Sequence, residues 1–281
     1  MATIYEDSKR RSPRLLRASS TTWIANVENS QTSNSKIDGS TSIIDQIKER
    51  VRNAISREKL RDPELNVVEV DLSGILDYKR SDVLTDIHET FAAERIDEKL
   101  FIKFDGPLKE IIHRRIANSI EPQLPGWSVN INTICEVNGN EFRPDIGAWN
   151  PPPTRLQSVF PLIHHCPHPL LWIEVAWNNS DHDNAIAKIS YILPFCPNTE
   201  FVLIGLPHTG ALFPGNPTPG VASAAIGVPL SARPHYAPYV GYWAPGAALG
   251  AVQWHLIQWN QHLPLAIGIN LELNLILNEL A

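Results

Sequence analysis

Two acidic residues, Asp145 and Glu174, have the type and setting expected of ligands for a hard metal cation. Asp145 follows a proline at the start of a predicted short strand, 142–149, and Glu174 lies near the end of another, 170–177. Apolar residues flank Glu174 on both sides, and an isolated buried carboxylate is costly to ionise unless it is paired or binds a metal. Two carboxylates at one sheet edge supply the oxygen ligands that Mg²⁺ prefers. A nearby lysine would complete a hydrolytic site by orienting or activating water beside the metal.

The chain around these acids resembles the PD-(D/E)XK nuclease-like superfamily and, within it, the broad restriction endonuclease family. The resemblance covers about residues 103–206. It is carried by a helix-opening segment with His113, the two acidic strands, a helix with a lysine and a tyrosine, and a closing apolar strand. In order, these segments are 106–116, 142–146, 171–175, 187–191 and 201–204.

The resemblance implies a role for each matching residue. Asp145 and Glu174 would bind Mg²⁺ or Mn²⁺, and the carbonyl of Val175 would be a third ligand. The usual lysine of the superfamily lies two residues after the acid, where this chain has Ala176. In this branch the lysine commonly lies on the following helix, and Lys188 is the matching position, from which it would serve the attacking water.

The resemblance also implies residues that meet the substrate. His113 and Tyr191 would border the site, and Arg114 would contact the substrate beside them. Together with neighbouring basic residues they give the locally basic edge that nucleic acid requires. These neighbours are Lys103, Lys109 and Arg115.

The function that follows is metal-dependent, endonuclease-like hydrolysis of phosphodiester bonds, with DNA as the expected substrate. An alternative keeps the fold and drops the chemistry. Asp145 would then cap a turn, Glu174 would form a buried ion pair with Lys188, and the domain would be a catalytically inactive module that binds nucleic acid or protein. The missing lysine at position 176 motivates this alternative.

The periodicity of the sequence predicts an α/β fold, with a restriction-endonuclease-like central mixed sheet flanked by helices. Helices are expected where apolar residues recur at helical spacing, at 42–61, 82–96, 107–121 and 183–195. Strands are expected where they alternate or run together, at 65–72, 127–137, 142–149, 170–177 and 200–206.

Composition divides the chain into four expected parts. A tail rich in Ser, Thr and Asn is expected to be disordered, and a helical and strand extension precedes the nuclease-like core. A Pro/Gly-rich and apolar C-terminal elaboration packs on the core, beginning with an irregular stretch at 207–248, and could join two copies in a homo-oligomer. The four parts are 1–40, 41–102, 103–206 and 207–281.

The 281 residues carry a formal net charge of −6 and are 43% hydrophobic, which excludes a polybasic protein whose whole surface follows phosphates. We expect no membrane partner, because no apolar run is long enough for a transmembrane helix. The N-terminus lacks the features of a secretory signal. Three cysteines fit a reducing compartment, so the expected location is intracellular, cytoplasmic or nuclear.

The segment 164–168 holds three histidines and Cys166, which offers a second kind of metal site. With Cys135, Cys196 or His182 it could bind zinc. The spacing is not that of a zinc finger, and its prolines favour a loop between strands.

Overall fold

The structure is a computed structural model that describes residues 42–61, 66–177, 179–206, 238–256 and 261–276. The chain separates into two compact units, Met1–Gly39 and Ser40–Ala281. The first unit, which includes most of the expected disordered tail, lies outside the described residues. The description that follows concerns the second unit. No helix in its described part is both long and apolar enough to cross a membrane.

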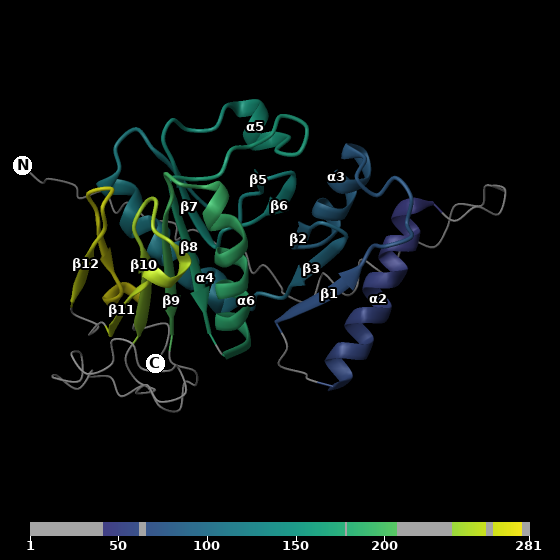
Figure 1. Ribbon diagram of the computed structural model, residues 1–281, viewed down its shortest axis with the longest axis horizontal. Helices are drawn as coiled ribbons and strands as arrows, with labels where there is room; N and C mark the ends of the chain where they lie inside the picture. The colour runs from purple at the N-terminus through teal and green to yellow at the C-terminus, as the bar shows by residue number, and fades with distance from the viewer. Residues whose placement is uncertain (1–41, 62–65, 178, 207–237, 257–260, 277–281) are drawn as a thin grey trace, which may run out of the picture. The chain divides into compact units, whose positions relative to one another are not determined.

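A six-stranded mixed sheet forms one half of this unit (Figure 1). Its strands pair in the order β11-β10-β9-β8-β7-β4, and only β8 and β9 run parallel. Their bounds are β4 Ser128–Ile131, β7 Ile146–Trp149, β8 Leu171–Ala176, β9 Glu200–Gly205, β10 Tyr239–Trp243 and β11 Gln253–Leu256. The parallel pair is joined by helix α6, Asn179–Ile192, which makes a βαβ unit.

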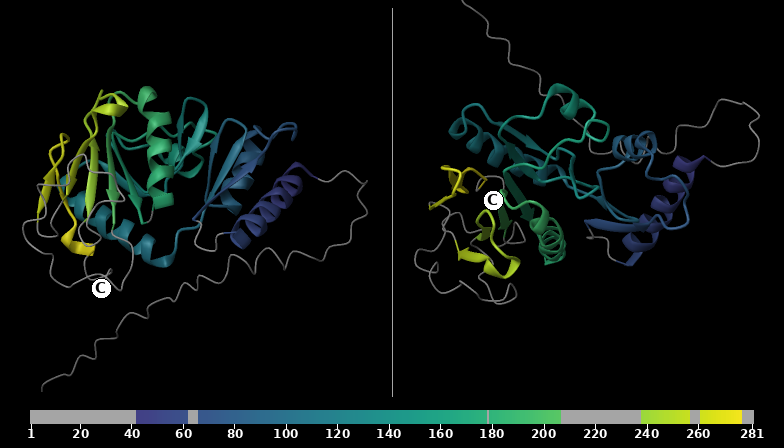
Figure 2. Two further views of the ribbon diagram at one scale, coloured as in Figure 1. Left: turned by 60° about the horizontal axis from the view of Figure 1, so that its bottom comes forward. Right: turned by 45° about the horizontal axis from the view of Figure 1, so that its top comes forward.

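Two helices cover opposite faces of this sheet, as Figures 1 and 2 show. Ile173 and Val175 of β8 pack in the core that contains α4, Pro107–Ile120. Trp172 and Ala176 pack in the core that contains α6. Because side chains alternate along a strand, Glu174 extends toward the α6 face. The predicted helices 107–121 and 183–195 are therefore present, and they sandwich the strand that carries the second acid.

A second sheet has five antiparallel strands in the order β1-β3-β2-β6-β5. Helices α2, Ile43–Arg61, and α3, Ser81–Thr90, complete its core with apolar residues such as Ile47, Val51 and Ile87. The strands are β1 Val67–Asp71, β2 Ala93–Ile96, β3 Lys99–Lys103, β5 Cys135–Val137 and β6 Asn140–Phe142. The fold is thus α/β, with mixed and antiparallel sheets flanked by helices.

The chain crosses between the two sheets three times, and two of these crossings correct the sequence prediction. The predicted strand 127–137 is divided into β4 and β5, and 142–149 is divided into β6 and β7. Asn132, with a φ of 52°, breaks the first. Pro144 lies in the second break, where it has no amide hydrogen to continue a ladder. The alternation of apolar and polar residues shows which side of a strand is buried. It does not show that the chain leaves one sheet and continues in another.

The predicted helix 82–96 is wrong in its second half. Helix α3 ends at Thr90, and Ala93–Ile96 forms strand β2 of a hairpin with β3. Asp97 turns the chain with a positive φ of 54°. Four residues of strand are too few to show a period that differs clearly from that of the helix before them.

The strand at 200–206 was expected to close the core, and the structure corrects this as well. Strands β10 and β11 extend the same sheet beyond β9. Part of the charge-poor C-terminal region therefore belongs to the sheet itself, and Tyr239–Trp243 is regular where irregular structure was expected. Most of that irregular stretch, 207–237, lies outside the described residues.

The first prediction concerns His88, which lies beside a buried ion pair between Arg95 and Glu141 in the five-stranded sheet. Arg95 donates from Nε and Nη2 to the two carboxylate oxygens of Glu141, each at 2.5 Å. His88 Nε2 lies 4.0 Å from Glu141 Oε2. Burial lowers the pKa of His88, although Glu141 opposes the effect. His88 therefore stays neutral in the folded chain at pH values where the unfolded chain, with a pKa of about 6.5, takes up a proton.

Because the unfolded state binds more protons, the free energy of unfolding should fall as the pH drops below about 6.5. The slope contributed by His88 cannot exceed about 1.4 kcal/mol per pH unit, which is the value for one proton taken up on unfolding. Urea unfolding between pH 7.5 and 5.5 should show a shallower slope for His88→Gln than for the wild type. The exposed His164 provides the matched control, and His164→Gln should keep the wild-type slope. Equal slopes for all three proteins would contradict this assignment.

Candidate functional site

A cavity of about 180 Å³ lies between strands β1 to β3 of the five-stranded sheet and helix α6. One part of its lining is apolar and the other part is charged. The residues that line it are Val67, Glu94, Ile96, Phe101, Lys103, Lys109, Asp145, Glu174, Val175, Asp181, Asn184, Ala185, Ala187, Lys188 and Tyr191. Both acids singled out from the sequence are among them.

Asp145 immediately precedes β7 and is 1% exposed. Its Oδ2 accepts a hydrogen bond from the backbone amide of Val175 at 2.8 Å, which links the start of β7 to β8. The same oxygen lies 3.6 Å from Nε2 of His113, and Oδ1 lies 3.4 Å from Nζ of Lys103. The break in the predicted strand 142–149 therefore places a carboxylate where several cationic groups converge.

Glu174 is 3% exposed in the middle of β8, all six residues of which are buried. Its Oε1 accepts a hydrogen bond from the indole of Trp172 at 2.7 Å and lies 2.5 Å from Nζ of Lys188. Lys188 reaches this position from α6, the helix that covers the same face of the sheet. The buried Glu174–Lys188 ion pair of the alternative interpretation is present, and it lies beside Asp145 at the cavity.

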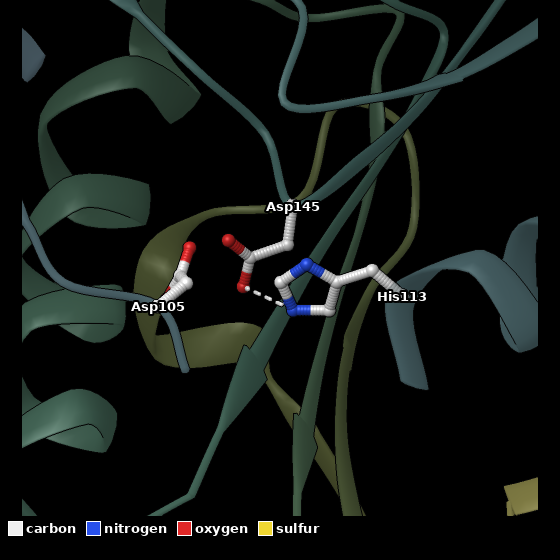
Figure 3. A group of neighbouring side chains, drawn as sticks. All are labelled: Asp105, His113 and Asp145. Carbon is white, nitrogen blue, oxygen red and sulfur yellow. Dashed lines mark ion pairs between the residues drawn. The ribbon is translucent and has the colours of Figure 1, made fainter. Parts of the chain in front are cut away.

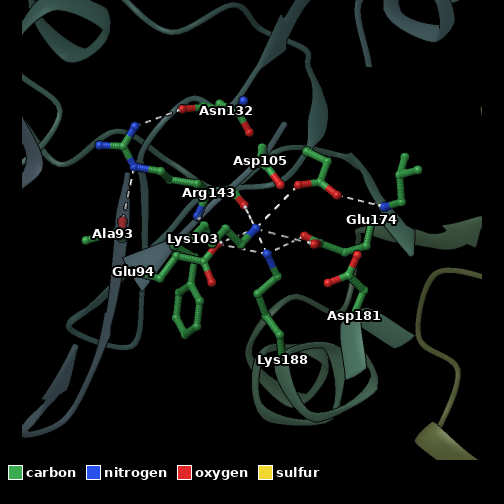
Figure 4. Close-up of polar contacts among 12 residues, drawn as sticks. Ala93, Glu94, Lys103, Asp105, Asn132, Arg143, Glu174, Asp181 and Lys188 are labelled. Carbon is green, nitrogen blue, oxygen red and sulfur yellow. Dashed lines mark hydrogen bonds and ion pairs between the residues drawn. The ribbon is translucent and has the colours of Figure 1, made fainter. Parts of the chain in front are cut away.

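Figure 4 shows a third carboxylate in the cluster, that of Glu94 on β2. Its Oε1 lies 2.8 Å from Nζ of Lys188 and 3.2 Å from Nζ of Lys103, and it accepts a hydrogen bond from the amide of Arg143 at 3.0 Å. The carbonyl of Arg143 accepts from Lys188 at 3.0 Å. The crossing between the sheets thus holds residues of both sheets and of α6 in one polar network.

A second group of possible ligands adjoins Asp145 (Figure 3). Asp105, His113 and Asp145 each offer a ligand atom, and these atoms lie within 4.8 Å of one another. His113 is fully buried, and neither of its ring nitrogens has a hydrogen-bond partner. Burial lowers its pKa, which favours the neutral imidazole that binds metals. Two carboxylates and an unsatisfied buried imidazole are a donor set that fits a divalent cation.

The pKa values of Asp145 and Glu174 shift in opposite directions. Burial acts to raise the pKa of Asp145, but the ammonium groups of Lys103 and Lys109 hold it well below its usual range. Burial also acts on Glu174, where the opposing effect of Lys188 and Lys103 is smaller, so its pKa rises to about 7. Neighbouring titratable groups with divergent pKa values are typical of functional sites.

The structure brings most of the predicted site residues together. Tyr191 lines the cavity, and its hydroxyl accepts a hydrogen bond from Asn140 Nδ2 at 2.6 Å. Ala176, which takes the place of the usual lysine, is buried at the end of β8. Arg114 is different, because it is exposed on α4 and is absent from the lining of the cavity.

Sequence reasoning missed Glu94 and Asp105. Glu94 was concealed inside the predicted helix 82–96. The available signal was Asp97, a residue type that favours turns, shortly before the alternating run 99–103. Asp105 comes two residues before the proline that opens α4. It lies between the predicted helices 82–96 and 107–121, where no element was predicted.

The zinc alternative gains no support from the described residues. His165 pairs with Glu136 on the surface, and His168 lies near Thr199 Oγ1. Cys135 and Cys166 are buried free thiols in the α6 core. Within the described part of the chain, Asp105, His113 and Asp145 form the one cluster of three such side chains at ligating distance.

No protein-family model matches the chain, and no curated protein matches it significantly. A solved structure from Anabaena variabilis ATCC 29413, described as a "putative nuclease belonging to DUF820", is similar at 14% sequence identity with a TM-score of 0.41. The similarity covers 67% of this chain and 91% of that chain.

Proposed function

We propose that this chain is a metal-dependent nuclease of the PD-(D/E)XK type that hydrolyses phosphodiester bonds, with DNA as its substrate. The observation that carries the proposal is the meeting of Asp145, Glu174 and Lys188 at one cavity. They come from three separate elements, and the side chains are buried together. Lys188, on α6, supplies the ammonium group that is missing at position 176, where this chain has alanine.

The proposed metal ligands are Asp145, Glu174 and the carbonyl of Val175, and Asp145 is also within reach of His113 and Asp105. Bound Mg²⁺ or Mn²⁺ would lower the pKa of a water ligand and offset the charge of the phosphate. Such ions use carboxylate oxygens together with substrate phosphate, which suits an acidic cluster that borders a cavity.

The protein's own contribution is a fixed positive charge at the same place. Lys188 is held by Glu174, Glu94 and the carbonyl of Arg143. A preorganised ammonium can orient the attacking water and stabilise the negative charge that develops on the phosphate. In this proposal His113 and Tyr191 border the reacting groups, and Arg114 contacts the nucleic acid outside the cavity.

A cleavage assay on the full chain tests this function and supplies the second prediction. Mg²⁺ or Mn²⁺ should support cleavage of DNA, and a chelator should abolish it. Lys188→Met should lower the rate at least about 100-fold, since the loss of one preorganised donor typically costs that much. Lys79→Met is a matched control, because Lys79 is exposed and is not part of the cavity lining. Cleavage that survives both the chelator and Lys188→Met would contradict the proposal.

One observation favours the alternative of an inactive binding module. Lys103 and Lys188 already lie within ion-pair distance of Glu94 and Glu174, so the acidic cluster has cationic partners of its own. Calorimetric titration of the folded chain separates the two functions. Binding of nucleic acid without association of Mg²⁺ or Mn²⁺ would identify the binding module.

A further inference from the structure

We propose that Lys103 sets the affinity of this site for divalent cations, because its ammonium holds the position between the three carboxylates and must leave when a cation binds. The inference rests on the proposed function and adds a residue to it. Lys103 thereby competes with the metal for the carboxylates that would bind it.

The ammonium group of Lys103 contacts all three acids of the cluster. Nζ lies 3.2 Å from Glu94 Oε1, 3.4 Å from Asp145 Oδ1 and 3.8 Å from Glu174 Oε2. Figure 4 shows the ammonium extending from β3 into the group of acids, opposite the end of Lys188. One tethered cation therefore contacts all three carboxylates of the cluster.

The second step is that these oxygens cannot serve the ammonium and a metal at once. Mg²⁺ requires its oxygen ligands at about 2.0–2.1 Å, much closer than any ammonium contact. In the described part of the chain, the three carboxylates do not form a group with all ligand atoms within 4.8 Å of one another. The ammonium between them explains this spacing. Cations that approach the same acids also repel each other, more strongly in a buried site than in water.

The third step distinguishes the two lysines. Lys188 makes short contacts at 2.5, 2.8 and 3.0 Å and lies over the ring of Trp172. The contacts of Lys103 are all 3.2 Å or longer, and its side chain is 13% exposed compared with 6% for Lys188. Both lysines line the cavity, so the difference between them lies in these contacts and in their exposure. Lys103 is therefore the displaceable lysine of the pair.

Calorimetric titration of the full chain with Mn²⁺ tests the inference. Lys103→Met should bind Mn²⁺ at least tenfold more tightly than the wild type, and Lys103→Arg, which keeps the charge, should not. Lys109→Met removes a positive charge at the same cavity, where Lys109 pairs with Asp105 at 2.8 Å. It should strengthen binding less than Lys103→Met does. Unchanged or weaker binding by Lys103→Met, or equal strengthening by Lys109→Met, would overturn the inference.

Two further results keep this test separate from that of the function. If the wild type binds Mn²⁺ and cleaves DNA while Lys103→Met binds no more tightly, the inference alone fails. If neither protein binds Mn²⁺, the proposed function fails with it. Should Lys103→Met not fold, a crystal structure of the wild type with Mn²⁺ decides, because Nζ of Lys103 should no longer lie within ion-pair distance of Asp145 and Glu174. An unmoved ammonium beside bound Mn²⁺ would overturn the inference.

Discussion

Replacement of Asp145 by asparagine should abolish metal-dependent cleavage. The variant keeps the size of the side chain and an oxygen that can accept the hydrogen bond from Val175. It loses the negative charge that the proposed metal site and Lys103 both require. We expect cleavage to fall at least about 100-fold, because this residue is shared by both groups of possible ligands. The loss of one partner from a buried ion pair should also lower the free energy of unfolding by about 3 kcal/mol.

The comparison needs a control that separates chemistry from folding. Asp86→Asn changes an exposed aspartate on α3 and should leave both cleavage and stability near the wild-type values. Glu174→Ala should lose cleavage as Asp145→Asn does. Rates should be measured at a temperature where circular dichroism shows every variant to be folded. Wild-type cleavage by both Asp145→Asn and Glu174→Ala would refute the nuclease assignment.

The second large effect is expected at Glu94, a residue that only the structure identified. Glu94 is 4% exposed and contacts Lys188, Lys103 and the amide of Arg143. Glu94→Gln keeps the shape of the side chain and removes one of the two carboxylates that fix Lys188. We expect the turnover rate to fall about 10–100-fold, as is typical when a group that orients a metal site is lost.

The same hairpin offers the control for this variant. Glu98 lies exposed at the turn, four residues after Glu94, so Glu98→Gln makes the same chemical change away from the site. A positioning role predicts that kcat falls more than KM changes, and that Glu94→Asp restores part of the rate. Glu94→Gln with the kcat of Glu98→Gln would show that Glu94 serves stability alone.

Much of the site was accessible from the sequence because its central residues come from consecutive elements. The apolar run around Glu174 predicted a buried strand, and the helix after it was evident from its spacing. Strand and helix pack together in a βαβ unit, so the proximity of Glu174 and Lys188 follows from local order. Asp145 required the resemblance as well, since a proline followed by an aspartate is common.

The other residues of the site, Glu94 and Lys103, come from the second sheet. No local sequence pattern shows that this sheet meets the first one at the site. Glu94 and Lys103 lie on the hairpin of β2 and β3. Glu94 precedes the segment that resembles the nuclease superfamily, about residues 103–206, and Lys103 lies at its first position. The contact of Glu94 with α6 and that of Lys103 with Glu174 on β8 arise because the chain crosses from one sheet to the other at Asn132 and Pro144. Predicting each crossing segment as one continuous strand hid the junction. It thereby hid the third carboxylate and the position of Lys103 between the acids, although Lys103 itself was expected at the basic edge of the site.

The distance along the chain between the members of this cluster has a consequence for synthesis. Glu94 and Lys188 are 94 positions apart, and β2 leaves the ribosome long before α6 does. A ribosome-bound chain that stops short of α6 has Glu94 but lacks Lys188, which links Glu94 to Glu174 in the folded chain. The cluster is therefore incomplete in every such nascent chain, and any cleavage that depends on it begins only after α6 has been made.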